Sequence, residues 1–374
     1  MADKQKRRKI SVSTASRSYK MLIGRGISDD VEGILVELFP GSRKIFFITN
    51  NKVFDIHGKK IIKKIEKSCN IKTLVLPDGE EYKSNSTLSK IYDFFMKNHA
   101  HRDDVVIAFG GGVIGDTAGF AAATFNRGLE LVHYPTTIIS QVDSSIGGKA
   151  AINFRGVKNI IGCFYQPHLI ICDPDLLNTL EEKELINGLG EIIKYGLVFD
   201  YKIIESIKEI LNENPESEER LKNMITDEKF DEIIFKCSKI KSDIVEKDEF
   251  DTGIRNYLNF GHTIGHAIEK VLGFKNISHG QAVSLGILCS VDISISLGFM
   301  KDSHKKELLN LYKLLKLPVR ISSENADAIV KAIHFDKKIT EGRTKFIILK
   351  KINDAIVING IDEAVIKKSI IKNT

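Results

Sequence analysis

The chain has 374 residues, which is long enough for two domains with substantial cores. Its formal net charge is +6, but 55 Lys and Arg nearly balance 49 Asp and Glu, and there is no tryptophan. The lysines are also scattered along the chain, so the charge does not indicate a nucleic-acid partner.

The cysteines and the apolar runs indicate where in the cell the protein is expected. Five widely spaced cysteines with no C-x-x-C favour a reducing, cytoplasmic location over a disulfide framework. No signal-peptide core is recognisable. The longest apolar run, at 282–298, contains Asp292 and four serines. It therefore predicts a buried helix and not a membrane span, and we expect no membrane partner.

The first half of the chain alternates between strand-like and helix-like segments. Residues 9–24 alternate polar and apolar positions and predict a first pair of strands. Further strands are predicted by short apolar runs at 44–50, 71–77, 104–110, 130–135 and 169–173. Helix-like segments, such as 88–98, lie between several of them. Strands alternating with helices predict a parallel sheet covered by helices on both faces.

The pattern changes near residue 175. Successive helices are predicted at 181–195, 203–212, 227–248, 258–272, 281–297 and 304–315. Residues 344–350 and 355–358 predict a small hairpin near the end. The expected organisation is therefore an α/β domain at 1–175, followed by a mainly helical domain at 176–374.

A glycine cluster follows the strand predicted at 104–110. Gly110, Gly112 and Gly115 satisfy G-x-G-x-x-G, a pattern whose backbone N–H groups can approach a pyrophosphate. The motif is weak by itself, because it follows the third strand of the sheet instead of the first. Its glycines could equally serve a tight strand-to-helix turn. Asp116 could complement the helix dipole or hold a hydroxyl of a ribose or ring.

A second polar segment, at 135–153, contains Thr136, Thr137, Asp143, Lys149 and Asn153. Lysines beside glycines suit a phosphate or carboxylate ligand, but a polar loop with a helix cap explains the segment equally well. In the next segment, Glu191 and Lys194 lie three residues apart and share one helix face. Such pairs are usually surface ion pairs, but apolar neighbours favour a functional role here.

Three histidines form the most informative pattern. His262 and His266 lie four apart, and His279 precedes an apolar run. Arg255 and Asn259 precede His262 at helical spacing, so both would share its face if the helix begins early enough. Four such polar side chains on one face would each need a partner if they were buried in a core. The pattern therefore indicates either a metal site or a proton-transfer site.

Taken together, the motifs GGGVIGD, FNRG, PTTIISQVDSSIGGK, KNIIGCFYQP, GLGEIIKYG, TGIRNYLNFGHTIGHAIE, SHGQAV and FDKK resemble the 3-dehydroquinate synthase family. The resemblance runs from about Lys44 to Leu349. It implies a Rossmann-like NAD-binding domain, a helical metal- and substrate-binding domain and an active site in the cleft between them. It also implies a homodimer, NAD as a catalytic cofactor and one divalent ion, either zinc or cobalt.

The resemblance also implies roles for individual residues. The metal ligands would be Glu191, His262 and His279, and His266 would handle protons. The implied cofactor-binding residues are Asn50, Glu80, Lys83, Gly111, Gly112, Val113, Asp116, Thr136, Thr137, Asp143, Lys149, Lys158 and Thr179. The implied substrate-binding residues are Asp143, Lys149, Lys158, Asn159, Lys194, Lys241, Arg255, Asn259, Lys337 (or Lys338) and Arg127 of the partner subunit.

Some positions depart from the pattern of the family. Asn50 stands where an aspartate commonly meets the cofactor ribose, and Lys52 stands where an asparagine is common. GGKAAINF replaces the GGKTGVNH of many members, and SHGQ replaces HGE. NAD affinity is the property that these differences concern most directly.

The implied activity is that of a phosphorus–oxygen lyase acting on 3-deoxy-D-arabino-heptulosonate 7-phosphate. It comprises transient oxidation by NAD, phosphate elimination, reduction, ring opening and aldol closure to 3-dehydroquinate, a step of the shikimate pathway. Three alternatives remain: a sister cyclase making a valiolone or a deoxy-inosose, a metal-dependent polyol dehydrogenase, and a non-enzymatic nucleotide binder. Lys241, Asn259 and His266 favour dehydroquinate over the sister cyclases. The many cations argue against the dehydrogenase, and an intact metal triad argues against the binder.

Overall fold

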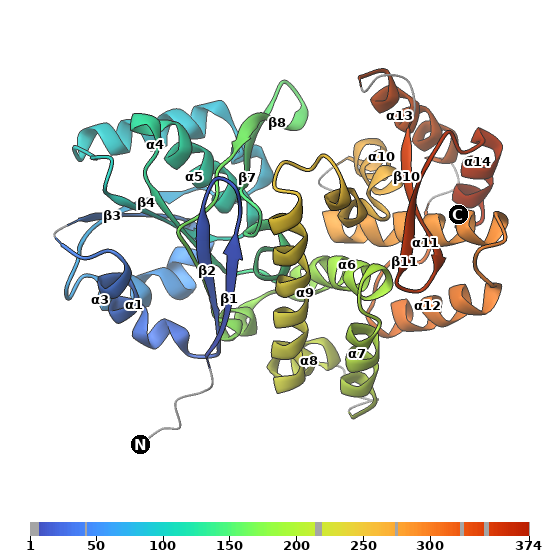
Figure 1. The fold of residues 1–374 in the computed structure, drawn as a ribbon, viewed down its shortest axis with the longest axis horizontal. Coiled ribbons are helices and arrows are strands. Elements are labelled where there is room, and N and C mark those ends of the chain that lie inside the picture. The colour runs from blue at the N-terminus through green and yellow to red at the C-terminus, as the bar shows by residue number, and fades with distance from the viewer. Residues whose placement is uncertain are drawn as a thin grey trace. The chain divides into compact units, whose positions relative to one another are not determined.

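The computed structural model describes residues 7–41, 43–213, 219–273, 276–321, 325–339 and 344–373, without the side chains of 334–339. The chain divides into two compact units (Figure 1). Unit 1 comprises Met1–Leu180 and Lys241–Phe250, and unit 2 comprises Glu181–Ile240 and Asp251–Thr374. Unit 1 is therefore discontinuous in sequence, because it includes Lys241–Phe250. The expected division at residue 175 placed that segment in the second domain.

Unit 1 is built on a seven-stranded sheet in the order β1-β2-β9-β6-β5-β3-β4. Only the pair β1–β2 is antiparallel, and the other neighbours are parallel. The strands are β1 (Arg8–Ser13), β2 (Ser18–Ile23), β3 (Lys44–Asn50), β4 (Asn70–Leu76), β5 (Val105–Gly110), β6 (Glu130–Pro135) and β9 (Leu169–Cys172). Each strand predicted from the sequence is present, and the expected parallel sheet is confirmed.

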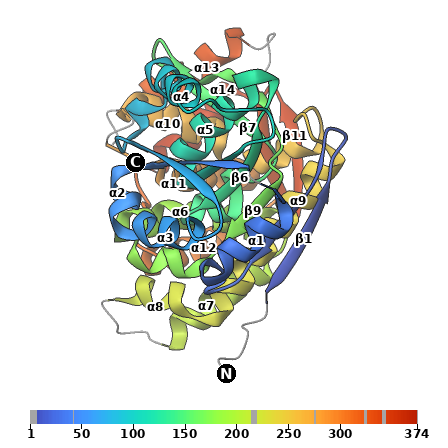
Figure 2. The same ribbon diagram turned by 90° about the vertical axis from the view of Figure 1, so that its left-hand side faces the viewer.

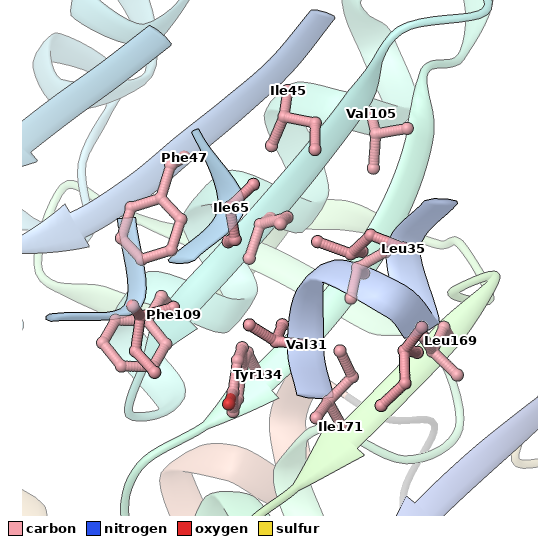
Figure 3. Packing of buried hydrophobic residues seen from close by; sticks show 14 of the residues in the cluster. Val31, Leu35, Ile45, Phe47, Ile65, Val105, Phe109, Tyr134, Leu169 and Ile171 are labelled. Carbon is pink, nitrogen blue, oxygen red and sulfur yellow. The ribbon is translucent and has the colours of Figure 1, made fainter. Parts of the chain in front are cut away.

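Helices cover both faces of this sheet. Figure 2 shows α1 (Val31–Leu38) and α3 (Lys59–Ile65) on one side, and α4 (Asn85–Lys97) and α5 (Gly112–Thr124) on the other. Strands buried on both faces consist almost entirely of apolar residues, as in β5, where every residue is buried. In Figure 3, Phe47 and Phe109 from the sheet lie in the same cluster as Val31 and Leu35 of α1.

Short elements connect the strands of unit 1. They are η1 (Ile27–Asp30), α2 (Asn51–Val53), η2 (Phe54–Gly58), η3 (Glu80–Tyr82), η4 (Phe125–Arg127), η5 (Ser140–Ser144) and η6 (Pro174–Thr179). A hairpin of β7 (Lys149–Phe154) and β8 (Val157–Phe164) lies within and beyond the polar segment at 135–153. The sequence did not predict this hairpin, because most side chains of β8 are exposed and leave no apolar alternation to detect.

The carboxylate of Glu249 explains why the end of α9 (Glu228–Lys247) and the residues after it belong to unit 1. It accepts hydrogen bonds from Thr14 Oγ1 at 3.0 Å, Ser16 N at 3.2 Å and Gln166 Nε2 at 3.0 Å. Glu246 adds one bond, accepting from the backbone N–H of Ser13 at 2.6 Å. These bonds tie the segment to the β1–β2 turn and to the residues before β9.

Unit 2 is mainly helical and surrounds the buried helix α11 (His279–Ser296). Its other helices are α6 (Glu182–Val198), α7 (Lys202–Glu213), α8 (Arg220–Thr226), the first part of α9, α10 (His262–Leu272), α12 (Asp302–Leu314), α13 (Ala326–Ile339) and α14 (Glu363–Ile371). The hairpin of β10 (Lys345–Lys351) and β11 (Asp354–Asn359) was predicted. Within the described ranges, no helix combines the length and the apolar character needed to cross a membrane.

One helix prediction was wrong at its start. The sequence predicted a helix at 258–272, and an earlier start would have placed Arg255, Asn259 and His262 on one face. In the structure, Arg255 and Asn259 belong to a separate 3₁₀ helix, η7 (Ile254–Asn259), and α10 begins at His262. Gly261 has φ +80°, a left-handed conformation that interrupts the helix. The four side chains therefore do not share one helix face.

Candidate active site

Three helices of unit 2 bring one carboxylate and two imidazoles together. Glu191 lies within α6, whereas His262 and His279 are the first residues of α10 and α11. Nε2 of His262 is 3.4 Å from Glu191 Oε1, and Nε2 of His279 is 3.3 Å from the same oxygen. All three potential ligand atoms lie within 4.8 Å of one another.

Glycines allow these helices to approach so closely. A Cβ on Gly190 would lie 2.2 Å from the carbonyl oxygen of Gly280, so α6 and α11 touch backbone to backbone. A Cβ on Gly286 would lie 2.0 Å from the carbonyl oxygen of Gly261, where α11 meets the start of α10. Gly190, Gly261 and Gly280 directly neighbour the three potential ligands in sequence. The same glycines therefore allow both the close helix crossings and the convergence of the potential ligands.

Both imidazoles are oriented through Nδ1. That atom of His262 is 3.2 Å from the carbonyl oxygen of Phe260, and that of His279 is 3.2 Å from Glu269 Oε2. A carbonyl or carboxylate oxygen only accepts, so each Nδ1 carries the hydrogen when these bonds form. In the neutral rings, Nε2 then has its lone pair facing Glu191.

The electrostatics of Glu191 follow from its neighbours. Its side chain is buried and forms an ion pair with Lys194, one turn along α6, as the i,i+3 spacing predicted. Burial by itself would raise the pKa of Glu191, but the Lys194 ammonium and the two imidazoles hold it well below its usual range. Burial disfavours the charged ring of His279, yet the neighbouring carboxylates of Glu191 and Glu269 outweigh it and raise the pKa of His279 to about 9.

This arrangement fits a divalent ion. Ligands about 2.0–2.2 Å from a tetrahedral ion lie roughly 3.3–3.6 Å apart, close to the separations of the two Nε2 atoms from Glu191. Neither carboxylate oxygen of Glu191 accepts a well-directed hydrogen bond from the described residues, although the carboxylate is buried. A buried carboxylate with two imidazoles, which bind a metal in their neutral form, is a donor set typical of catalytic zinc.

His266 lies beside this group without belonging to it. Its side chain is exposed, and its ring centroid is 5.4 Å from that of His262 and 5.8 Å from that of His279. His266 also forms a second potential ligand group with Glu269 and His279. An exposed imidazole at this position can exchange protons with solvent.

The other candidate residues of unit 2 differ in burial. Lys194 and Arg255 are buried, with 1% and 2% of their surface exposed, whereas Asn259 is half-buried. A buried cation needs an anion beside it, and Lys194 has one in Glu191. The backbone of Lys337 belongs to α13, but its side chain and that of Lys338 lie outside the described residues.

In unit 1, Lys83 joins two further candidates. Its ammonium contacts both the carboxylate of Asp116 and the amide oxygen of Asn159. Burial raises the pKa of Asp116, and the positive charge of Lys83 opposes that shift. Glu80 accepts a hydrogen bond at 2.9 Å from Asn153, whose Oδ1 in turn accepts one at 2.9 Å from the N–H of Asn159. Residues after β4, at the start of α5 and in the β7–β8 hairpin thus form one polar network.

A second pair in unit 1 involves Lys241. Its ammonium contacts the carboxylate of Asp143 and donates to the carbonyl oxygen of the same residue at 3.0 Å. Lys149 is exposed at the start of β7, and Lys158 is half-buried in β8. Gly148, with φ +70°, packs against Gln166, so the turn before Lys149 is closely packed.

The glycine loop leads directly into α5. Gly111 is the N-cap, Gly112 is the first helical residue and Val113 follows in the first turn. A Cβ on Gly111 would lie 3.1 Å from Thr137 Cγ2, and the buried Thr136 Oγ1 has no hydrogen-bond partner among the described residues. N–H groups at a helix N-terminus and an unsatisfied hydroxyl fit the pyrophosphate of a dinucleotide.

The remaining candidates lie elsewhere in unit 1. Asn50 Oδ1 caps α2 by accepting from the N–H of Val53, and Asn50 Nδ2 donates to Asp78 Oδ1 at 2.7 Å. Thr179 Oγ1 is 2.7 Å from His57 Nε2. Arg127 is exposed in η4 and has φ +62°.

Sequence reasoning did not assign three residues that touch the candidates: His57, Asp78 and Glu269. Glu269 carried a detectable signal, because it lies seven residues after His262 and therefore on nearly the same face of α10. Asp78 and His57 carried none, because their contacts join segments that are distant in sequence.

Comparisons with known proteins agree over nearly the whole chain. A family model described as the 3-dehydroquinate synthase N-terminal domain matches residues 73–187, and the corresponding C-terminal model matches 188–339. A 3-dehydroquinate synthase of Dehalococcoides mccartyi strain CBDB1 is 40% identical over 356 residues, covering 94% of this chain and 96% of that protein. One from Microcystis aeruginosa is 35% identical over 360 residues, covering 96% of each.

Solved structures show the same fold. A 2-epi-5-epi-valiolone synthase from Streptomyces hygroscopicus, with NAD⁺ and Zn²⁺ bound, superposes with a TM-score of 0.86 at 23% identity over 96% of this chain and 98% of that one. A 2-deoxy-scyllo-inosose synthase complexed with carbaglucose-6-phosphate, NAD⁺ and Co²⁺ has a TM-score of 0.83 at 24% identity over 98% of this chain and 100% of that one. At such identities the likeness concerns the fold. The two family models and the sequence identities show that the chain belongs to the 3-dehydroquinate synthase family.

Proposed function

We propose that the protein converts 3-deoxy-D-arabino-heptulosonate 7-phosphate to 3-dehydroquinate and phosphate, as a step of the shikimate pathway. The observation that carries the proposal is 40% identity to a 3-dehydroquinate synthase over 94% of the chain. The convergence of Glu191, His262 and His279 supports it, because the reaction needs an activated hydroxyl group.

The proposed cofactors are NAD and one divalent ion, either zinc or cobalt, held by Glu191, His262 and His279. When bound, the ion supplies Lewis acidity that lowers the pKa of a substrate hydroxyl, and NAD supplies a reversible hydride acceptor. The backbone N–H groups at Gly111 and Gly112 and the hydroxyl of Thr136 are proposed to hold the cofactor pyrophosphate. The remaining proposed cofactor residues are Asn50, Glu80, Lys83, Val113, Asp116, Thr137, Asp143, Lys149, Lys158 and Thr179.

The proposed substrate has a phosphate and a carboxylate, so it needs cationic partners. We assign the phosphate to Lys149, Asn159, Arg255 and Lys337. Lys194 and Lys241 are assigned to the carboxylate and the ring hydroxyls. The nearly complete burial of Arg255 and Lys194 supports these roles, because an ammonium or guanidinium removed from water gains most from an anionic ligand.

Proton movement is assigned to His266, since it is exposed to solvent and lies beside the proposed ligands. Asp143 and Asn259 are proposed to orient the substrate hydroxyls, and Asp143 already holds the ammonium of Lys241. Oxidation at C5 acidifies the neighbouring C6 proton, and the leaving phosphate can take that proton. NAD, when bound, would accept a hydride from C5 and later return it there, so the overall reaction would be redox-neutral.

The proposed assembly is a homodimer in the cytoplasm, in which Arg127 of the partner subunit completes the substrate-binding set. The exposure of the Arg127 side chain in η4 supports this role, since such a side chain is accessible to another subunit.

One assay tests the proposal. The protein is loaded with zinc or cobalt and incubated with the heptulosonate phosphate and substoichiometric NAD, and both phosphate and 3-dehydroquinate are measured. We expect the two products in equal amounts, with more turnovers than NAD molecules present. Release of phosphate without 3-dehydroquinate, or no turnover, would refute the proposed activity. Turnover of a different sugar phosphate instead would identify a sister cyclase.

A further inference from the structure

A buried carboxylate that the proposed mechanism does not use lies behind one of the potential metal ligands. Glu269 belongs to α10 and has only 3% of its surface exposed. In sequence it directly follows Ala267 and Ile268, which both belong to a buried hydrophobic cluster. A carboxylate in such surroundings is unfavourable unless specific partners accompany it. One such partner is the imidazole of His279.

The ring of His279 spans the distance between two carboxylates. Its Nδ1 is 3.2 Å from Glu269 Oε2, and its Nε2 is 3.3 Å from Glu191 Oε1. His279 therefore belongs to two potential ligand groups, one with Glu191 and His262 and one with His266 and Glu269. The nitrogen of His279 beside Glu269 is Nδ1, whereas the nitrogen beside Glu191 is Nε2. A neutral imidazole offers only one lone pair, so the group that binds an ion determines the role of Glu269.

The geometry of His262 favours the first group. Its Nδ1 is 3.2 Å from the carbonyl oxygen of Phe260, and its Nε2 faces Glu191 Oε1 at 3.4 Å. The two imidazoles thus share one arrangement, with Nδ1 bonded to a protein acceptor and Nε2 directed at the same carboxylate oxygen. In the second group, by contrast, one ligand would be the exposed His266.

We propose that Glu269 is a positioning residue that accepts the Nδ1 hydrogen of His279 and so keeps Nε2 available to the metal ion. Glu269 is not itself a ligand. A carboxylate behind a metal-binding imidazole fixes the tautomer and the orientation of the ring and makes the ring a better donor. The inference rests on the proposed metal centre, but it concerns metal binding and is tested without turnover.

The test measures zinc dissociation constants of the full chain by competition with a chromophoric chelator. Glu269→Ala should weaken zinc binding about 10–100-fold, the usual effect of removing such a partner. Glu269→Gln, which keeps an oxygen acceptor but loses the charge, should weaken it less. His266→Ala should leave the zinc affinity unchanged, and each chain should bind one ion. Glu191→Gln serves as the reference for loss of a ligand.

Two results would overturn the inference. If Glu269→Gln abolished zinc binding as Glu191→Gln does, and His266→Ala did the same, Glu269 would be a ligand of the second group. If Glu269→Ala kept wild-type affinity, it would have no positioning role. The absorption spectrum of the cobalt-loaded Glu269→Gln variant provides a readout should the alanine variant not fold, because an unchanged ligand set preserves the d–d bands. A wild-type chain that bound zinc without turning over the sugar phosphate would refute the proposed function alone.

Discussion

Replacing Gly280 by alanine should greatly weaken zinc binding, although none of the proposed ligand residues is changed. The added methyl carbon would lie 1.7 Å from the carbonyl oxygen of Asn187 on α6, whereas ordinary contacts begin at 3.4 Å. Neither atom can move away by side-chain rotation, because one is a Cβ and the other is backbone. The start of α11 must therefore move away from α6 by about 1.7 Å.

This displacement is large on the scale of metal coordination, in which ligand distances hold to about 0.2 Å. His279 immediately precedes Gly280, so its Nε2 would leave the position that faces Glu191. We expect the zinc dissociation constant to rise by more than about 100-fold, beyond the usual effect of losing only a partner behind a ligand. The fold itself should lose about 1–3 kcal/mol, as is typical of overpacking.

Chelator competition and urea unfolding of the metal-free chain measure the two effects. Gly196→Ala is the matched control, because Gly196 lies on the same helix as Glu191. Its methyl group would meet Cδ1 and Cγ1 of Ile204 at 2.6 Å, and that side chain can rotate away. The control should therefore lose stability but keep its zinc affinity. Wild-type zinc affinity in Gly280→Ala would refute the argument that the glycine crossing positions the ligands.

Four further predictions concern His279, Lys83 and Glu249. Because two neighbouring carboxylates raise the pKa of His279 to about 9, zinc must displace a proton from the ring below that pH. Its dissociation constant, followed with a chelator, should therefore fall roughly tenfold per unit from pH 7 to 9 and then level off, whereas a flat profile would contradict the raised pKa. The stabilising effect of charged His279 on the metal-free chain should be complete below pH 6.5 and disappear as the pH passes about 9, which thermal unfolding can follow. Lys83→Met should lower the free energy of unfolding, measured in urea, by about 3 kcal/mol, because Asp116 loses its cation. Adding Asp116→Asn should restore part of that free energy, whereas additive losses would exclude a coupled pair. Glu249→Ala should lower the free energy of unfolding by roughly 3 kcal/mol and Glu246→Ala by roughly 1 kcal/mol. The carboxylate of Glu249 accepts several hydrogen bonds, whereas that of Glu246 accepts one from Ser13, so equal losses would contradict this reasoning.

Local sequence patterns predicted most of the secondary structure. Every strand of the main sheet was predicted, because buried parallel strands are short apolar runs bounded by polar residues. The principal error, at Arg255 and Asn259, arose because helical spacing continues through Gly261 while the backbone does not. Spacing alone does not distinguish a glycine inside a helix from one with φ +80° before it.

The sequence motifs by themselves indicated the family and the residue types available for chemistry, and the alternation of apolar segments indicated the α/β and helical character of the two parts. The shared face of Glu191 and Lys194 followed from a spacing of three on one helix. The tertiary structure decided which of three histidines face Glu191 and which nitrogen each presents. That outcome depends on glycine contacts between α6, α10 and α11 and on acceptors such as Glu269, and packing between helices distant in sequence leaves no periodic signal in the chain.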